Sequence, residues 1–374
     1  MAQSWIEQAR QLMRRSVESV ERGKKRFENL FSNQGSDYLP LVLAVPVPEL
    51  SAMPRFNYRE SFFDPEKMAI SQAADALARA RSGSDAQPTI RPNTGVGTVM
   101  SVFGLSQEIL TDAMPWPKEH LSKEQIADLE PIEDVSNVEL MVHIKKIVEF
   151  YQTHLPEFPI TVFDTQGPFD IAHLVRGDQI FYDFHDDVGF VRHLMELSTN
   201  ACIRGTEYAK KLIGEVPNQA YHTGMFLSAA GVRVCEDTSV LIGPRELEQF
   251  VLPYTQRVMD YFGGGYVHYC GRNDHLLDMS IEQMPACRYL NLGNPDLHDI
   301  VDVIRRLSRA GKVYCGGIHR QKGEALEAYF RRLLSALDGK RFGLILVAKL
   351  TPEESTDPQS VIDLYHRVQD ELLS

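Results

Sequence analysis

YVHYCGRNDHLLDMSIEQMPACRYLNLGNPDLHDIVDVIRRLSRAGKVYC, residues 266–315, is the stretch that decides the fold. The apolar runs at 266–269, 288–292 and 312–315 have the length of strands, whereas 296–310 repeats apolar residues at helical spacing. Strands that alternate with helices in this way form a parallel sheet with the helices packed outside it. The stretch therefore predicts an α/β fold.

The same alternation continues on both sides of this stretch. Further strand-length runs lie at 40–45, 88–90, 160–163, 231–234 and 343–347. Further helical patterns lie at about 66–83, 137–154, 185–213, 244–262, 322–338 and 358–373. Eight strands in one chain of 374 residues predict a closed (β/α)8 TIM barrel. An open doubly wound sheet is the alternative, because periodicity alone does not separate the two.

The chain outside the regular pattern suggests two additions to the barrel. Residues 1–37 form a predicted N-terminal helical extension, with one long amphipathic helix over 3–33 and a break at 33–37. The barrel itself would occupy 38–374, with a long loop excursion around 92–136 over its mouth. Within the helix predicted at 244–262, Pro253 is expected to produce a kink.

Composition narrows the class of protein. The net charge of -12, from 39 Lys+Arg against 51 Asp+Glu, argues against nucleic acid and anionic membrane as partners. The apolar runs are far shorter than a membrane span, and residues 1–33 lack the apolar core of a signal peptide. Five unclustered cysteines do not suggest a disulfide framework, so reduced thiols and a cytoplasmic location are expected.

The ends of the predicted strands carry the candidate metal ligands. His268 and Cys270 stand two positions apart, so a strand would point both side chains to one face. Cys315 closes a neighbouring strand. Two thiolates and an imidazole with a fourth position open are typical of catalytic zinc. The alternative is that both cysteines are buried core thiols and His268 is a hydrogen-bonded strand-end histidine.

Other polar side chains follow the same strand ends and give the remaining site candidates. The candidate catalytic residues are Asp164, Asp237 and His222, and the candidate substrate-binding residues are Arg91, Asn93, Gln166 and Glu236. Turn formation and helix capping would explain several of these residues without any function. No GxSxG, P-loop, HExxH or CxxC motif occurs in the chain.

Several short motifs, taken in order, resemble those of the uroporphyrinogen decarboxylase superfamily. They are Gln166-Gly167-Pro168-Phe169-Asp170-Ile171-Ala172, Gly231-Val232-Arg233-Val234 through Asp237, Leu241-Ile242-Gly243-Pro244, Phe250-Val251-Leu252-Pro253-Tyr254 and His268-Tyr269-Cys270-Gly271. The resemblance spans most of 40–370 and is strongest over 160–320. It implies a (β/α)8 barrel and one of two chemistries.

The decarboxylase branch fits this chain poorly. True uroporphyrinogen decarboxylases carry an Arg-Gln-Ala-Gly-Arg segment near the N-terminus that binds substrate carboxylates. Here the corresponding region, 41–48, reads LVLAVPVP and has no arginine pair. Porphyrinogen decarboxylation is therefore not expected.

The other branch comprises methyltransferases that move a methyl group from a corrinoid to a thiol such as coenzyme M. Its members hold zinc with His-x-Cys and a later Cys, and His268 and Cys270 match the first two positions. The last strand, 344–349, carries no cysteine and ends in Lys349. We therefore expect Cys315 to replace the missing ligand, and Lys349 to weaken the metal site or to draw anionic substrates towards it.

Taken together, the residues and the resemblance predict a zinc-dependent methyltransferase that uses a corrinoid or similar donor. The alternative is a metal-free decarboxylase or lyase, in which Asp237 or Asp164 protonates a carbanion and Arg91 holds a carboxylate. A third interpretation is a corrinoid- or tetrapyrrole-binding protein without turnover. The expected partners are a small-molecule substrate, a corrinoid protein and a second copy of the chain.

Overall fold

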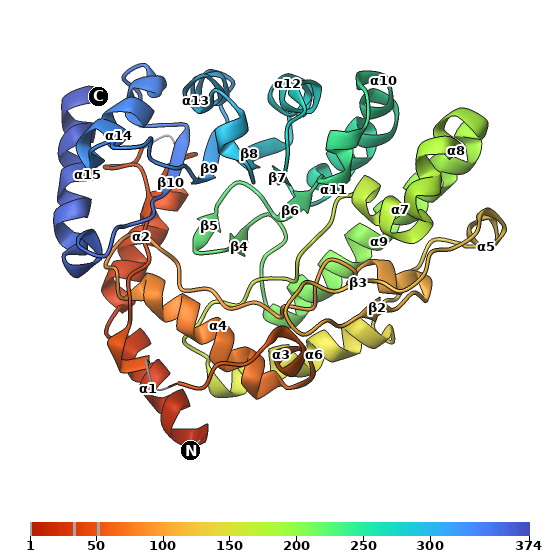
Figure 1. Cartoon of the computed structure of the whole chain (residues 1–374), viewed down its shortest axis with the longest axis horizontal. Coiled ribbons are helices and arrows are strands. Elements are labelled where there is room, and N and C mark those ends of the chain that lie inside the picture. The colour runs from red at the N-terminus through yellow and green to blue at the C-terminus, as the bar shows by residue number, and fades with distance from the viewer. Residues whose placement is uncertain (1, 33–34, 51–52) are drawn as a thin grey trace.

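A six-stranded parallel sheet forms the centre of the molecule (Figure 1). The computed structural model describes residues 2–32, 35–50 and 53–374. The strand order is β1-β10-β9-β8-β7-β6, so the first strand of the chain lies beside the last. The bounds are β1 (Leu41–Val42), β6 (Val232–Cys235), β7 (Gly265–Tyr269), β8 (Cys287–Leu292), β9 (Val313–Gly317) and β10 (Leu344–Val347). The predicted α/β class with a parallel sheet is confirmed.

The strands predicted at 88–90 and 160–163 take part through single contacts rather than regular ladders. One parallel bridge joins Ile90 to Ile160, and another joins Gln166 to Cys235. The backbone N–H of Asp85 donates to the carbonyl of Leu41 at 3.0 Å. Six of the eight predicted strands thus have a regular ladder, and within the described residues no continuous ladder closes the sheet into a barrel.

A β-hairpin at the centre of the molecule explains why the ladder is interrupted. It consists of β4 (Ala220–His222) and β5 (Met225–Leu227), and it lies at the centre of Figure 1. The backbone N–H of Gln87 donates to Gly224 O at 2.7 Å, and Gly224 N–H donates to Thr89 Oγ1 at 3.2 Å. The segment after Asp85 therefore pairs with the hairpin turn and not with β1.

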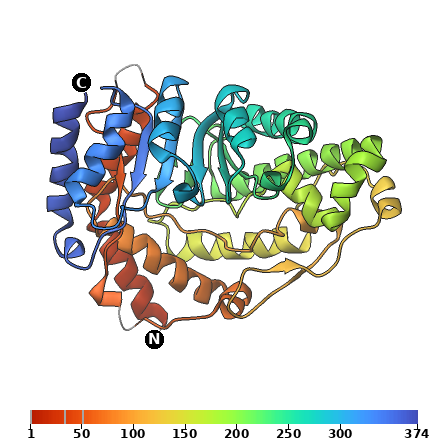
Figure 2. The ribbon, with the colours of Figure 1, turned by 45° about the horizontal axis from the view of Figure 1, so that its top comes forward.

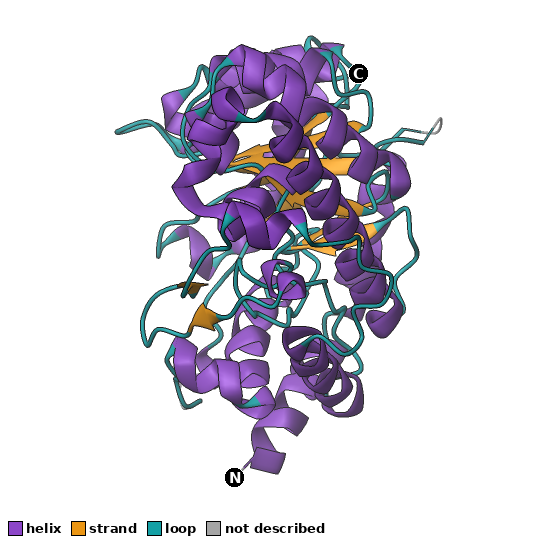
Figure 3. Cartoon of the chain, turned by 90° about the vertical axis from the view of Figure 1, so that its right-hand side faces the viewer, coloured by secondary structure: helices purple, strands orange, loops and turns teal. Residues whose placement is uncertain are grey.

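Helices cover the outer side of the sheet (Figures 1 and 3). α11 packs against β6 and β7, α12 against β8, and α13 against β9. The helices beyond the N-terminal region are α3 (Tyr58–Phe63), α4 (Pro65–Ala80), α5 (Lys123–Ala127), α6 (Glu139–His154), α7 (Pro168–Arg176), α8 (Ile180–Asp186), α9 (Val188–Ile213), α10 (Pro244–Glu246), α11 (Leu252–Tyr261), α12 (Asp274–Glu282), α13 (Ile300–Arg309), α14 (Leu326–Leu334) and α15 (Pro358–Leu372). None of the helices described is long and apolar enough to cross a bilayer.

The N-terminal region differs from the single helix that the sequence predicted. Two helices, α1 (Ala2–Arg14) and α2 (Val17–Asn29), meet at Arg15 and Ser16. They serve different cores, because Trp5, Ala9 and Met13 join a small cluster with α4 and α6, whereas Phe27 joins the main core. One straight helix cannot reach both clusters, so the chain turns between them (Figure 2). Of the break predicted at 33–37, residues 33 and 34 lie outside the described residues.

Two other predicted irregularities have a defined form. Before Pro253, residues Leu247–Val251 form a π-helical turn that leads directly into α11. Since proline has no N–H for the carbonyl four residues earlier, a widened turn is a reasonable way to continue the helix. The excursion predicted around 92–136 contains a small antiparallel pair, β2 (Gln107–Glu108) and β3 (Trp116–Pro117), together with α5.

Candidate active site

Side chains alternate between the two faces of the sheet along β6 and β7. Every second residue therefore faces the inner side, away from the covering helices. The register pairs Arg233 with Tyr266 and Cys235 with His268. Glu236 faces the opposite way, because its carboxylate accepts a hydrogen bond from Thr255 on α11, outside the sheet. Arg233 and Cys235 therefore point inwards in two successive layers, about 7 Å apart along the strand.

His268 is held in one orientation by Asn291 on the neighbouring strand. The Asn291 Nδ2 group donates to the Cys315 carbonyl at 2.7 Å, so its Oδ1 must be the atom that lies 2.6 Å from His268 Nδ1. An amide oxygen only accepts, so Nδ1 carries the proton and Nε2 keeps its lone pair. Burial lowers the pKa of His268, and the Arg233 guanidinium lowers it further, which keeps the imidazole neutral.

The free Nε2 atom of His268 faces a set of donors suited to a metal ion. It lies 3.7 Å from Cys270 Sγ and 3.9 Å from Asp237 Oδ1. Donor atoms of Cys235, Asp237 and His268 all lie within 4.8 Å of one another. Tetrahedral zinc with its usual bond lengths requires an N···S separation of about 3.6 Å, close to that of His268 and Cys270. The geometry and the donor types therefore fit zinc.

Two glycines leave the space that this arrangement needs. A Cβ atom on Gly293 would lie 2.5 Å from Cys270 Sγ and 3.3 Å from the His268 ring. A Cβ atom on Gly316 would lie 1.9 Å from Asn291 Nδ2. Both distances are too short for any larger side chain, so the chain can place His268, Cys270 and Asn291 here only with glycine at both positions.

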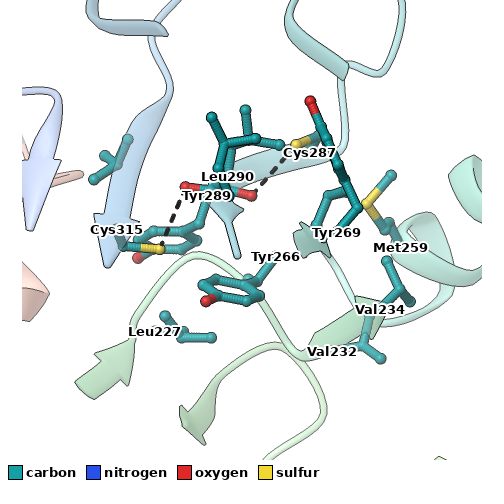
Figure 4. Packing of buried hydrophobic residues seen from close by; sticks show 14 of the residues in the cluster. Leu227, Val232, Val234, Met259, Tyr266, Tyr269, Cys287, Tyr289, Leu290 and Cys315 are labelled. Carbon is teal, nitrogen blue, oxygen red and sulfur yellow. Dashed lines mark hydrogen bonds between the residues drawn. The ribbon is translucent and has the colours of Figure 1, made fainter. Parts of the chain in front are cut away.

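Cys315, which was expected to be the third zinc ligand, lies apart from these donors. Its thiol is fully buried and hydrogen-bonds to the Leu290 carbonyl at 3.8 Å. Figure 4 shows it in the packed core beside Tyr289 and Tyr266, and burial raises its pKa well above the ordinary value. The contribution of Cys315 to the site is its carbonyl, which orients Asn291, and not its sulfur. Among the described residues, Cys235 is the cysteine whose sulfur lies within 4.8 Å of donor atoms on both Asp237 and His268.

A charged layer lies one step deeper than the thiols. Asp164 forms a very short ion pair with Arg233, and its Oδ1 lies 3.8 Å from Arg91 Nη1. Burial alone would raise the pKa of Asp164, but Arg233 and Arg91 reverse the effect and lower it. Asp164 is therefore ionised at neutral pH, and its side chain still keeps 16% of its surface exposed.

His222 enters this layer from the hairpin turn. Its ring lies 5.1 Å from that of Tyr266, and its Nε2 atom is 3.2 Å from Thr223 Oγ1. Burial lowers the pKa of His222 well below the ordinary value, and Arg233 and Arg91 lower it further. The structure therefore brings His222 close to Asp164 as a neutral imidazole. Thr223 has φ 39°, an uncommon conformation for a residue with a side chain.

The expected substrate-binding residues have different surroundings. Arg91 Nη2 donates to Asn93 Oδ1 at 3.2 Å, which places Asn93 behind Arg91. Gln166 is buried, and its Nε2 group has no hydrogen-bond partner among the described residues. Lys349 is exposed after β10, and its ammonium group forms no ion pair with any residue described.

Glu236 was expected to bind substrate, and its position argues against that role. The side chain is fully buried on the outer side of the sheet, where its carboxylate accepts hydrogen bonds from Ser239 and Thr255. Burial raises the pKa of Glu236 to about 7. The neighbouring Asp170 accepts the backbone N–H groups of Asp237 and Thr238, at 3.0 and 2.8 Å. These two acids therefore support the loop that carries Asp237.

Three residues of the site were not predicted from the sequence: Arg233, Cys235 and Asn291. The strand was expected to end at 234, which left Cys235 outside it. The signal was nevertheless present, since Arg233, Cys235 and Asp237 stand two positions apart, as His268 and Cys270 do. Nothing in the sequence alone marked Asn291, whose role depends on the register between β7 and β8.

The chain is similar to one protein family in sequence and to a known methyltransferase structure in fold. The family profile described as Uroporphyrinogen decarboxylase (URO-D) matches residues 22–320. No curated protein matches the chain. Among solved structures, a methyltransferase from Methanosarcina mazei is similar with a TM-score of 0.65 and 14% identity, over 93% of this chain and 98% of that one. At this identity, the likeness concerns the fold.

Proposed function

The chain belongs to the uroporphyrinogen decarboxylase family, and on that premise we propose that it is a zinc-dependent methyltransferase that delivers a methyl group to a thiol. The observation that carries the proposal is the lone pair of His268 Nε2, which faces Cys270 Sγ at 3.7 Å and Asp237 Oδ1 at 3.9 Å. The name of the similar Methanosarcina mazei structure, a methyltransferase, agrees with it.

The residues that would hold zinc are His268 and Cys270, with either Cys235 or Asp237 as the third ligand, so that a fourth tetrahedral position stays open for the substrate thiol. When bound, zinc lowers the pKa of a substrate thiol that occupies the open position, which makes the substrate sulfur a nucleophile at neutral pH. Burial raises the pKa of Cys270 to about 11 and that of Cys235 well above its ordinary value. Neither cysteine would be ionised at neutral pH without a cation beside it, so these thiols need a metal in order to act as thiolates.

The other residues of the site position these donors or contact the substrate. Asp237 Oδ1 accepts the backbone N–H of Cys270 at 2.5 Å, which ties the two strand ends together. Asn291 fixes the tautomer of His268. His222, neutral and half-buried, can donate or accept a hydrogen bond with substrate, and the ionised Asp164 is a fixed negative charge in the floor of the site.

The alternative, a metal-free decarboxylase, finds less support in this geometry. It requires a carboxylic acid that can protonate a carbanion at neutral pH. Asp164 is unsuited to that role, because the two arginines lower its pKa and keep it ionised. Asp237 already accepts the Cys270 N–H, and its side chain is 45% exposed, so it lies at the solvent end of the site and is tied to the loop.

Zinc content and methyl transfer test the proposal together. Protein purified without a metal-affinity tag should contain about one zinc per chain and should demethylate methylcobalamin in the presence of a thiol, seen as a change in visible absorbance. His268→Ala and Cys270→Ala should lose both the zinc and the activity. The matched control is Cys315→Ala, which removes a thiol from the core and should keep the zinc. Zinc-free wild-type protein, or zinc that survives in Cys270→Ala, would contradict the proposal.

The remaining details of the proposal follow from the same premise. We propose that the eight segments act as one (β/α)8 barrel, in which the hairpin of β4 and β5 stands where the ladder is interrupted. A corrinoid carried by a separate protein is the proposed methyl donor. A cytoplasmic location and a homodimer stay predictions.

A further inference from the structure

Arg233 has more hydrogen-bonding capacity than the protein around it uses. Its Nη1 group serves both Asp164 and the Thr165 carbonyl, the latter at 3.3 Å. Its Nη2 group has no partner among the described residues, although the side chain is only 12% exposed. A guanidinium has five N–H donors in a planar fork, and a buried fork that is half used is costly to maintain.

The charges around Arg233 leave a positive excess. Two guanidinium groups, those of Arg233 and Arg91, face the single carboxylate of Asp164. Asp237 is the next acid in electrostatic reach, but it lies at the exposed end of the site and accepts the Cys270 N–H. The buried end of the site, around Arg233, therefore favours the binding of a ligand with one negative charge.

The position of this charge relative to the metal donors limits the size of the ligand. Arg233 is one layer below Cys235, so its Cα lies about 7 Å deeper along the strand. The register of β6 and β7 pairs Cys235 with His268 and Arg233 with Tyr266, so Arg233 lies one layer beneath Cys235 and His268. A molecule that reaches from these donors to Arg233 spans only a few bonds.

We propose that Arg233, with Arg91 beside it, binds the anionic group of a short organic acid whose other end reacts at His268 and Cys270. This inference rests on the proposed function for the identity of the reacting end as a thiol. It differs from carboxylate binding by the N-terminal arginine segment of true uroporphyrinogen decarboxylases, because this chain has no arginine at 41–48. Here the arginine comes from β6, and Asp164 fixes its orientation.

Three small molecules of matched size test the inference by isothermal titration of the protein as purified. They are 3-mercaptopropionate, its neutral counterpart 3-mercaptopropanol, and butyrate, which keeps the acid and lacks the thiol. The wild-type protein should bind 3-mercaptopropionate on the order of 10- to 100-fold more tightly than 3-mercaptopropanol, as expected of a charged hydrogen-bonded pair. Equal affinity for the acid and the alcohol would overturn the inference.

The variants separate the arginine from general electrostatics. In the double variant Arg233→Gln/Asp164→Asn, which leaves the net charge unchanged, the preference for the acid should disappear. Arg233→Lys keeps the charge and loses the fork, so it should reduce the preference several-fold, and it provides the test if the double variant does not fold. Arg257→Gln, on the exposed surface of α11, should behave as wild type. A preference that survives in both Arg233 variants would refute the assignment.

Butyrate distinguishes this inference from the proposed function. If the thiol chemistry is wrong and the anion site is right, butyrate should still bind, and its binding should still depend on Arg233. If the thiol chemistry is right and the anion site is wrong, both thiols should bind equally well and butyrate should not bind.

Discussion

At β6 and the residue directly after it, Glu236, the two faces of the sheet differ in what their polar side chains can still do. On the outer face, Glu236 is fully buried and its carboxylate is satisfied by Ser239 and Thr255. On the inner face, Arg233 Nη2 has no partner among the described residues, and the sulfur of Cys235 lies within 4.8 Å of donor atoms on Asp237 and His268. Both faces are charged and buried, so burial and charge alone do not identify a functional residue.

Unused bonding capacity is what separates the two faces. The outer acid is a structural group, because each of its two carboxylate oxygens already accepts a hydrogen bond within the protein. The inner residues are held in place by neighbours, Arg233 by Asp164 and His268 by Asn291. Their other nitrogens, Arg233 Nη2 and His268 Nε2, remain available to bind a ligand. The predictions below test this difference, beginning with the largest effect.

Removing Arg233 should destabilise the protein more than any comparable surface change. Arg233→Leu would leave Asp164 buried with only the more distant Arg91, and breaking a buried pair in this way costs about 3–5 kcal/mol of unfolding free energy. Urea denaturation followed by circular dichroism measures it. Arg257→Leu, which breaks an exposed pair with Glu196, should cost less than about 1 kcal/mol. Similar losses in both variants would mean that the inner pair has no special energetic role.

On the outer face, Glu236 should make the stability depend on pH. Burial raises its pKa to about 7 from an unfolded value of 4.5, so the ionised form is disfavoured in the folded protein. Its contribution is most favourable below pH 4.5 and declines as the pH rises to 7, by on the order of 3 kcal/mol. Glu236→Gln keeps the size of the side chain and removes the titration.

The unfolding free energy of wild type, measured at several pH values, should therefore fall relative to that of Glu236→Gln between pH 4.5 and 7. Above pH 7 the difference should be constant, with the variant the more stable protein. Parallel curves over the whole range would show that Glu236 is not the source of the dependence.

Asn291 should affect the metal without binding it. Asn291→Ala removes the acceptor that fixes the tautomer of His268, and the loss of such a partner lowers metal affinity roughly 10- to 100-fold. Competition for zinc with a chromophoric chelator measures the change. Ser122→Ala is the control, because Ser122 caps α5 at the exposed surface and accepts the Gln125 N–H at 3.3 Å. It should cost about 1 kcal/mol in stability and leave zinc affinity unchanged.

Sequence patterns located the strands well where strands are long and regular. The apolar runs at 231–234, 266–269, 288–292, 312–315 and 343–347 correspond to β6 to β10 within one or two residues. The predictions at 88–90 and 160–163 were less complete, because the backbone groups there bond to the hairpin turn or form single bridges. A competing partner from a distant part of the chain leaves no periodic signal.

The site was predicted in part, for a similar reason. Spacing along one strand brought His268 and Cys270 together, and the structure places them 3.7 Å apart. The choice between Cys315 and Cys235 depends on contacts between different strands, because both cysteines are buried. Only the contacts show that Cys315 bonds to the Leu290 carbonyl while Cys235 lies near Asp237 and His268. The different surroundings of the two cysteines follow from the register between strands, which sequence patterns alone do not predict.

The hairpin of β4 and β5 also sets the order in which the polypeptide can mature during translation. Val42 and Gln87 both lie against Gly224 in the hairpin turn. The two strand segments that contain them therefore lack this contact until the ribosome has added more than a hundred further residues. At the usual speed of synthesis this takes on the order of 10 seconds or more. The N-terminal quarter of the nascent chain therefore stays without this partner until a segment from the middle of the chain has been made.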